Sequence, residues 1–270
     1  MSSLTSAERK SVTVLDFLGA RQAGRRLTML TAYDYTMARL IDAAGIDAIL
    51  VGDSLGMVMQ GKDTSLSVTM ADMIYHTKLV ARGISHCLLV ADMPFMSYHL
   101  SPQQALENAG RLVQEGGAHA VKLEGGRRSV DAIRAIVDAE IPVMGHVGLT
   151  PQSVRKIGGF RVQRHEASLL DDAKAVEQAG AFALVVECVP AAIGEKITRA
   201  LSIPTIGIGA GPACDGQILV SHDLLGLYNE IRPKFVKMYA DLGAAAKAAV
   251  TAYRDEVVAG VFPGPEHVFK

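Results

Sequence analysis

The chain has 270 residues with a formal net charge of −1, and 49% of its residues are hydrophobic and 20% charged. This composition provides a sizeable core and excludes general disorder and the basic stripe of a nucleic-acid binder, while the length fits two average domains or one α/β barrel. No apolar run reaches the ~18 residues of a membrane span, and residues 1–10 lack the apolar centre of a signal peptide, so we expect a cytoplasmic protein without membrane or nucleic-acid partners.

Short apolar runs typical of buried strands alternate along the chain with segments of helical periodicity. In chain order the pattern predicts a helix over 12–21, a strand over 27–34, a helix over 35–44, a strand over 47–54, a helix over 70–82, a strand over 87–94, a helix over 102–115, a strand over 120–126, a helix over 130–139, a strand over 142–149, a helix over 167–179, a strand over 181–189, a helix over 191–201, strands over 204–211 and 216–223, and one or two helices over 233–259.

Eight predicted strands with helical crossovers favour a closed parallel barrel. A doubly wound sheet is the alternative, although no G-x-G-x-x-G follows the first strand. We therefore expect an α/β protein with one (β/α)8 TIM-barrel domain over residues 1–270, an N-terminal capping helix and C-terminal helices.

Three carboxylates lie at the ends of consecutive predicted strands, where the catalytic loops of a barrel gather. They are Asp53, Asp92 and Glu124, on strands two, three and four. Neighbouring strands are about 4.8 Å apart, so these groups can converge on one hard cation, and oxygen-only ligation suits Mg²⁺. The alternative for Asp53 or Asp92 taken alone is the N-cap of the next helix.

Lys122 precedes Glu124 by two residues, so alternation places both side chains on one side of the strand, towards the barrel interior if Val121 and Leu123 face the helices. Such a cation can hold a substrate carboxylate. A structural Lys–Glu pair and a Schiff-base lysine are the alternatives.

Glu187 and His146 are titratable residues inside apolar runs. Glu187 follows Ala-Leu-Val-Val, and a carboxylate in such surroundings has a raised pKa, as a general base or acid needs near neutrality. A structural glutamate bonded to a backbone amide is the alternative. His146 is either a buried, hydrogen-bonded histidine or a supporting catalytic group.

Several segments of the chain together resemble the ketopantoate hydroxymethyltransferase family. They are MLTAYDY (29–35), VGDSLGMV (51–58), VKLEGG (121–126), GHVGLTPQS (145–153), LVVECVP (184–190), IPTIGIGAGPACDGQILV (203–220) and FPGPEH (262–267), in family order and nearly end to end. One departure is Arg164, which stands in a short loop where the family usually has glycine.

The resemblance implies transfer of a hydroxymethyl group from 5,10-methylenetetrahydrofolate to 3-methyl-2-oxobutanoate, giving 2-dehydropantoate on the route to pantothenate. It implies that Mg²⁺, held through Asp53 and Asp92 with Glu124 nearby, chelates the substrate. Ser54 and Lys122 would bind the substrate carboxylate, and Glu187 would remove the C3 proton. It also implies a homo-oligomer, often a decameric ring.

Three other functions stay open at this point. One is a Mg²⁺-dependent lyase or mutase of the phosphoenolpyruvate/pyruvate-barrel type, which needs no folate. Another is a Schiff-base aldolase that acts through Lys122. The third is a non-catalytic binding barrel, which leaves the ionisable groups at the strand ends without a purpose.

Overall fold

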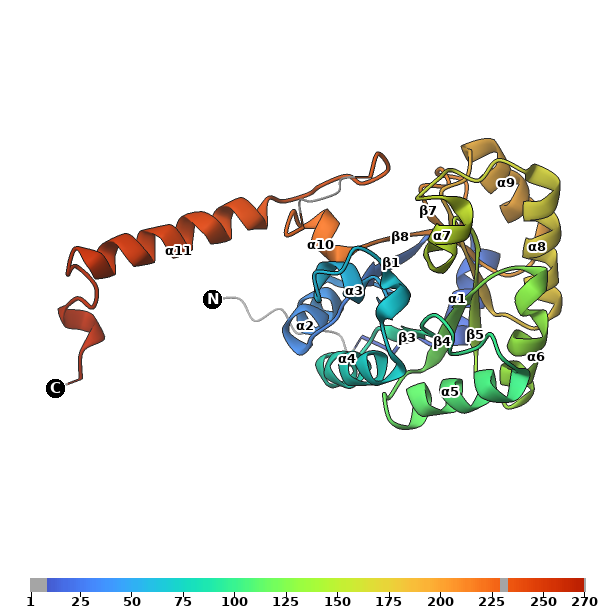
Figure 1. Ribbon diagram of the computed structural model, residues 1–270, viewed down its shortest axis with the longest axis horizontal. Helices are drawn as coiled ribbons and strands as arrows, with labels where there is room; N and C mark the ends of the chain where they lie inside the picture. Colours follow the sequence, from blue (N-terminus) through green and yellow to red (C-terminus); the bar gives the residue numbers. More distant parts are fainter. Residues whose placement is uncertain (1–8, 229–232, 270) are drawn as a thin grey trace. The chain divides into compact units, whose positions relative to one another are not determined.

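The computed structural model of the protein describes residues 9–228 and 233–269. Its internal contacts divide the chain into two units, with the boundary between Val220 and Ser221. The first unit contains the sheet and the helices around it, and the second contains the C-terminal helices (Figure 1). The expectation of a single domain over residues 1–270 stays a prediction.

The first unit is a closed barrel of eight parallel strands that pair in sequence order, with β8 returning to β1. This confirms the predicted (β/α)8 fold. Near-continuous burial of most strands explains why they read as apolar runs rather than alternating ones, whereas the first and the last strand each carry an exposed residue. The strands are β1 (Leu27–Thr31), β2 (Ala48–Val51), β3 (Leu88–Asp92), β4 (Ala120–Glu124), β5 (Val143–Gly148), β6 (Ala183–Glu187), β7 (Thr205–Ile208) and β8 (Gly216–Leu219).

Helices connect successive strands and cover the outside of the barrel (Figure 1). The six crossover helices predicted from the sequence lie within one residue of their expected bounds: α2 (Tyr35–Ala44), α4 (Met70–Gly83), α5 (Pro102–Gln114), α6 (Val130–Asp138), α8 (Glu166–Gln178) and α9 (Ala191–Ala200). Short helical turns occupy the loops after β2, β4 and β5: α3 (Leu55–Val58), η1 (Ser65–Ser67), η2 (Arg127–Ser129), η3 (Pro151–Ser153) and α7 (Val154–Ile157).

The apolar core has two layers. The outer layer lies between strands and helices and includes Val121 and Leu123. The inner layer fills the barrel and includes Leu88 and Ala120, the first residues of their strands. Val121 and Leu123 therefore face the helices, which turns the intervening Lys122 inward as the strand alternation predicted.

Helix α1 (Val14–Gln22) closes the end of the barrel at which the strands begin, and this confirms the predicted N-terminal capping helix. Thr13 and Asp16 form a capping box at its start. Phe17 is fully buried with the inner core, and its ring meets that of Phe182 edge to face at 6.0 Å.

The second unit contains α10 (Ser221–Leu224), α11 (Leu242–Val258) and η4 (Pro265–His267). The sequence predicted that strand eight extends to residue 223. In the structure β8 ends at Leu219, and helix α10 begins at Ser221. Helix α11 lies within the predicted terminal segment, and none of its residues is buried. Among the described residues, no helix has the length and apolar character to cross a membrane.

Candidate active site

Ionisable side chains gather at the ends of β2 to β6 and form a group that we call the acid–lysine cluster: Asp53, Asp92, Lys122, Glu124, His146 and Glu187. The strand register places them together, because Asp92 is paired with Lys122, Glu124 with His146, and Gly148 with Glu187. The sequence predicted each of these residues for the site. Apart from Glu187, which is partly exposed, all are at most 5% exposed.

The two aspartates are connected through the backbone. Asp53 donates its N–H to Asp92 Oδ2 at 3.0 Å. Ser54, not Asp53, is the N-cap residue of α3, and Ser101 is that of α5, so the helix-cap interpretation of Asp53 and Asp92 is wrong. Gly52 permits the close approach of Asp92 to the backbone before Asp53, since a Cβ at position 52 would lie 2.8 Å from Ser54 Oγ and 3.4 Å from Asp92 Oδ2.

Ser54 is half-buried at the edge of the cluster. Its hydroxyl shares a 2.8 Å hydrogen bond with the hydroxyl of Tyr33 and makes no capping bond to α3. A hydroxyl free of the helix backbone in this place can bind a polar ligand group.

Lys122 is the cation of the cluster. Its Nζ lies 2.8 Å from Asp92 Oδ1, in an ion contact without hydrogen-bond alignment, and 3.2 Å from His146 Nδ1. Burial works against the charged lysine, but the carboxylates of Asp92 and Glu124 outweigh it and raise the Lys122 pKa above its ordinary value. Lys122 therefore stays charged near neutral pH, which opposes the Schiff-base interpretation because an amine nucleophile must be unprotonated.

Gln152 joins the two sides of the carboxylate group. Its Nε2 donates to Asp53 Oδ2 at 2.9 Å, and its backbone N–H donates to Glu124 Oε2 at 3.1 Å. Tyr98 donates its hydroxyl to Gln152 Oε1 at 2.6 Å and accepts from the Glu124 backbone N–H. Sequence reasoning missed both residues. Gln152 stands inside the GHVGLTPQS segment, which was the available signal, whereas Tyr98 belongs to none of the segments that carry the resemblance.

Burial and crowding of like charges raise the carboxylate pKa values. Burial, followed by the neighbouring charge of Asp92, raises the pKa of Asp53 to about 7. Burial and Asp53 raise the pKa of Glu124 well above its ordinary value. The carboxylates outnumber the lysine, so the cluster favours an additional positive charge.

Glu187 and His146 form the part of the cluster nearest β6. Glu187 Oε2 lies 3.2 Å from His146 Nε2, and burial raises the pKa of Glu187 to about 7. Burial and Lys122 lower the His146 pKa well below its ordinary value, so the ring is neutral. Because Lys122 is a donor towards Nδ1, the ring hydrogen belongs on Nε2, facing Glu187. Nε2 lies beside the Glu187 carboxylate but makes no aligned hydrogen bond among the described residues.

The end of β5 allows Glu187 to approach. Gly148 has a φ of 98°, and a Cβ at this position would lie 2.1 Å from the carbonyl oxygen of Glu187. Glycine is therefore required for close pairing of β5 and β6 beside Glu187.

Arg164, the departure from the family pattern, is exposed in the loop before α8.

The donor set of the cluster fits Mg²⁺. Asp92 Oδ1 is buried beside Lys122 Nζ at 2.8 Å without an aligned hydrogen bond among the described residues, and Asp53 is adjacent to it. Within residues 9–228 and 233–269, no group of three or more His, Cys, Asp or Glu side chains is arranged as a ready metal site. Mg²⁺ characteristically takes one or two protein carboxylates and completes its shell with water and substrate oxygens. The interpretation of Asp53, Asp92 and Glu124 as joint ligands stays a prediction.

Comparison with known proteins gives a match along nearly the whole chain. The sequence profile described as ketopantoate hydroxymethyltransferase matches residues 11–265. The chain is 58% identical over 262 residues to the 3-methyl-2-oxobutanoate hydroxymethyltransferase of Clostridium beijerinckii, covering 96% of this chain and 95% of that protein. It is also 58% identical over 268 residues to the enzyme of the same name from Moorella thermoacetica, covering 98% and 100%.

Solved structures of low sequence identity share the fold. Phosphonopyruvate hydrolase in complex with oxalate and Mg²⁺ superimposes with a TM-score of 0.63 at 14% identity, covering 96% of this chain and 92% of that chain. A 2,3-dimethylmalate lyase of the PEP mutase/isocitrate lyase superfamily gives a TM-score of 0.61 at 16% identity, covering 95% and 91%. At these identities the likeness concerns the barrel alone.

Proposed function

The chain belongs to the ketopantoate hydroxymethyltransferase family of transferases, and we propose that it transfers a hydroxymethyl group from 5,10-methylenetetrahydrofolate to 3-methyl-2-oxobutanoate. The product is 2-dehydropantoate, on the route to pantothenate. The observation that carries the proposal is Glu187, a half-buried carboxylate with a pKa near 7 that faces neutral His146 at the rim of the acid–lysine cluster.

The cluster has the charges needed to hold a 2-oxo acid. Lys122 and the hydroxyl of Ser54 would bind the substrate carboxylate, and Asp53 and Asp92, which lie next to one another, would hold Mg²⁺ with Glu124 nearby. Bound there, Mg²⁺ would supply Lewis acidity that lowers the energy of an enolate oxygen. The phosphonopyruvate hydrolase that shares this fold is in complex with oxalate and Mg²⁺, which supports this choice of metal and ligand class.

Glu187 acts as the base. Its carboxylate removes the proton from C3 of the 2-oxo acid, and neutral His146 lies beside the carboxylate, with Nε2 at 3.2 Å from Oε2. The substrate carbon left with the electron pair bonds to the methylene carbon of the folate donor as the bond from that carbon to one donor nitrogen breaks, and this nitrogen takes up a proton. Water bonds to the same carbon as the bond to the second nitrogen breaks. Water thus supplies the hydroxyl oxygen of the product and the second nitrogen's proton, and tetrahydrofolate leaves.

Exchange of the C3 proton in D₂O tests this role without folate. Glu187→Gln keeps the shape of the side chain but removes the base, so we expect the exchange rate to fall by about 10²- to 10⁴-fold. Glu195→Gln on α9, at a salt-bridged glutamate outside the cluster, is the matched control and retains the wild-type rate. Unchanged exchange in Glu187→Gln would contradict the assignment, and product formation without folate would favour the lyase or mutase alternative.

The cytoplasmic location, the absence of nucleic-acid and membrane partners, and the homo-oligomer, a decamer by resemblance, stay predictions.

A further inference from the structure

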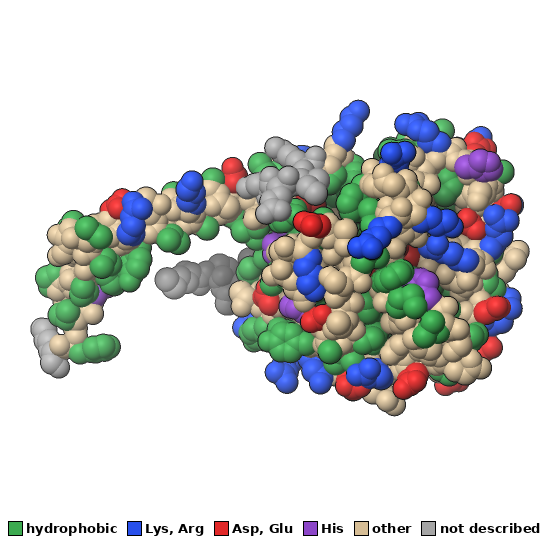
Figure 2. All heavy atoms as spheres, viewed as in Figure 1, with side chains coloured by type: hydrophobic (Ala, Val, Ile, Leu, Met, Phe, Trp, Pro, Cys, Tyr) green, Lys and Arg blue, Asp and Glu red, His purple; other side chains and the backbone are tan. Residues whose placement is uncertain are grey.

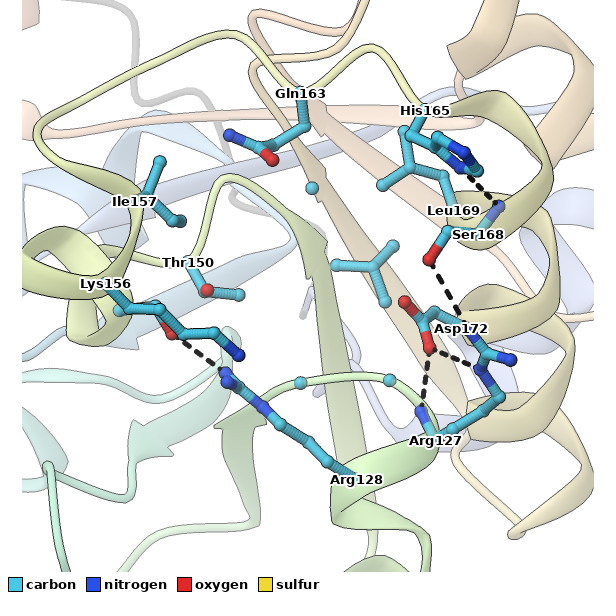
Figure 3. A pocket seen from close by; sticks show the side chains of 15 residues that line it. Arg127, Arg128, Thr150, Lys156, Ile157, Gln163, His165, Ser168, Leu169 and Asp172 are labelled. Carbon is cyan, nitrogen blue, oxygen red and sulfur yellow. Dashed lines mark hydrogen bonds and ion pairs between the residues drawn. The ribbon is translucent and has the colours of Figure 1, made fainter.

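A cavity of about 450 Å³ lies over the ends of β4 and β5, between α7 and the first turns of α8 (Figure 3). We call it the basic pocket, and its wall includes Arg127, Arg128, Lys156, Ile157, Leu169 and Asp172. Figure 2 shows Lys and Arg side chains gathered on this part of the surface, around α7. Its volume is in the range of pockets that take small organic ligands.

The basic pocket has a surplus of positive charge. Asp172 Oδ1 accepts from the backbone N–H of Arg127 at 3.0 Å and from its Nε at 3.1 Å, so this pair neutralises itself. Arg128 donates to the neutral hydroxyl of Ser153 at 3.0 Å. In the described part of the chain, neither Arg128 nor Lys156 has a carboxylate within ion-pair distance, and Figure 3 shows their side chains directed towards one another.

Two cations that approach one another without a carboxylate repel, and an anionic ligand removes the repulsion. The rest of the wall is mixed and includes polar Thr150, Gln163 and Ser168, but Ile157 and Leu169 face the cavity from two sides and can hold a ring between them (Figure 3). The pocket therefore fits a molecule that combines a flat apolar part with carboxylates.

The basic pocket is adjacent to the acid–lysine cluster through the backbone. Gly125, in the pocket wall, donates its N–H to the carbonyl of His146 at 2.9 Å. Gln163, in the opposite part of the wall, donates its N–H to the carbonyl of Cys188, the residue after Glu187. A ligand in the pocket thus lies next to the residues that would carry the chemistry.

We propose that the basic pocket binds the p-aminobenzoyl-glutamate part of the folate donor. The glutamate carboxylates bind Arg128 and Lys156, and the benzoyl ring packs between Ile157 and Leu169. This inference rests on the proposed function, because that reaction requires a second substrate of this chemistry beside the bound 2-oxo acid.

The test compares 5,10-methylenetetrahydrofolate with 5,10-methylenetetrahydropteroate, which lacks the glutamate, as donors. The wild type should have a lower KM for the folate than for the pteroate. In Arg128→Gln/Lys156→Gln, we expect the ratio of the two KM values to approach one, a change of about tenfold or more for the loss of charge-assisted hydrogen bonds. Arg155→Gln removes a neighbouring exposed cation of α7 outside the pocket wall and should keep the wild-type ratio.

The single variants Arg128→Gln and Lys156→Gln should shift the ratio in the same direction by a smaller factor, so the test does not depend on folding of the double variant. An unchanged ratio, or an equal rise in both KM values, would overturn the assignment.

Direct binding separates this inference from the proposed function. p-Aminobenzoyl-glutamate should bind the wild type and lose affinity in the double variant, and inorganic phosphate should not displace it at equal concentration. Phosphate that binds through Arg128 and Lys156 without competition from p-aminobenzoyl-glutamate would overturn the assignment. Failure of the proposed function has a different signature: p-aminobenzoyl-glutamate binds, but the wild type forms no folate-dependent product.

Discussion

Replacement of Lys122 by methionine tests whether the acid–lysine cluster depends on its one lysine. The Lys122 side chain is 5% exposed and that of Asp92, 2.8 Å away, is 6% exposed. Methionine fills a similar volume, so the change mainly removes the charge. Removal of one partner of a buried ion pair costs about 3–5 kcal/mol, and we expect the free energy of unfolding to fall by roughly this amount at pH 8.

The loss of unfolding free energy in Lys122→Met should depend on pH. Burial and Asp92 raise the pKa of Asp53 in the folded wild type to about 7, above its ordinary value. Between these two pKa values the folded protein holds a proton that the unfolded chain has lost, so the free energy of unfolding falls as the pH rises towards 7. Lys122 holds this pKa down, and without it the folded pKa rises further. Stability of Lys122→Met then continues to fall above pH 7, by up to about 1.4 kcal/mol per pH unit, where the wild type has levelled off.

Urea unfolding at pH 6 and pH 8 measures this difference, with a chelator present and at a fixed protein concentration. The destabilisation should be smaller at pH 6 than at pH 8. Lys174→Met, at an exposed position on α8, is the control and should change the free energy of unfolding by less than about 0.5 kcal/mol. A loss below about 1 kcal/mol in Lys122→Met, or a loss that is equal at both pH values, would refute the reasoning.

Three further predictions concern the base, the bridging amide and the capping helix. The rate of C3 proton exchange should rise with pH up to about 7 and then level off, since Glu187 is active when deprotonated and burial raises its pKa to about 7; a rate that is flat from pH 5.5 to 7 would contradict this. Gln152→Leu leaves Asp53 Oδ2 and the carbonyl of Met93 without their Nε2 donor, so unfolding in urea should show a loss of about 1–3 kcal/mol, and no loss would show that water replaces the amide. Phe17→Ala should lower the free energy of unfolding by about 3–5 kcal/mol, measured in the same way, while C3 exchange at saturating substrate stays at the wild-type rate; slower exchange would show that α1 influences the site from the opposite end of the barrel.

The sequence was sufficient to predict the barrel because burial on both faces makes most of the strands nearly continuous apolar runs, and helices of amphipathic period separate the runs. It also indicated the inward side of β4. Strand alternation places Lys122 and Glu124 on one side, and Val121 and Leu123 on the side that contacts the helices. Asp53 and Asp92 could be predicted as neighbours because strands of such a barrel pair in sequence order.

Contacts between loops depend on the tertiary structure instead. Gln152 meets Asp53 across 99 positions of the chain and Tyr98 across 54, and neither spacing follows a helix or strand period. The sequence left His146 open between a buried, hydrogen-bonded histidine and a supporting catalytic group. Its position between Lys122 and Glu187 follows from the register of β5 with its two neighbours.

The basic pocket, too, could not be predicted from the sequence and depends on the tertiary structure. Arg128 and Lys156 are ordinary exposed cations in the sequence, carried by two separate loops. The barrel brings these loops together at one rim, because parallel strands all end on the same side. The sequence by itself determined the scaffold and the charges at the strand ends, whose positions follow from local periodicity. Only the folded chain decided which of those charges are paired and which loops enclose a cavity, because these contacts join residues far apart along the chain.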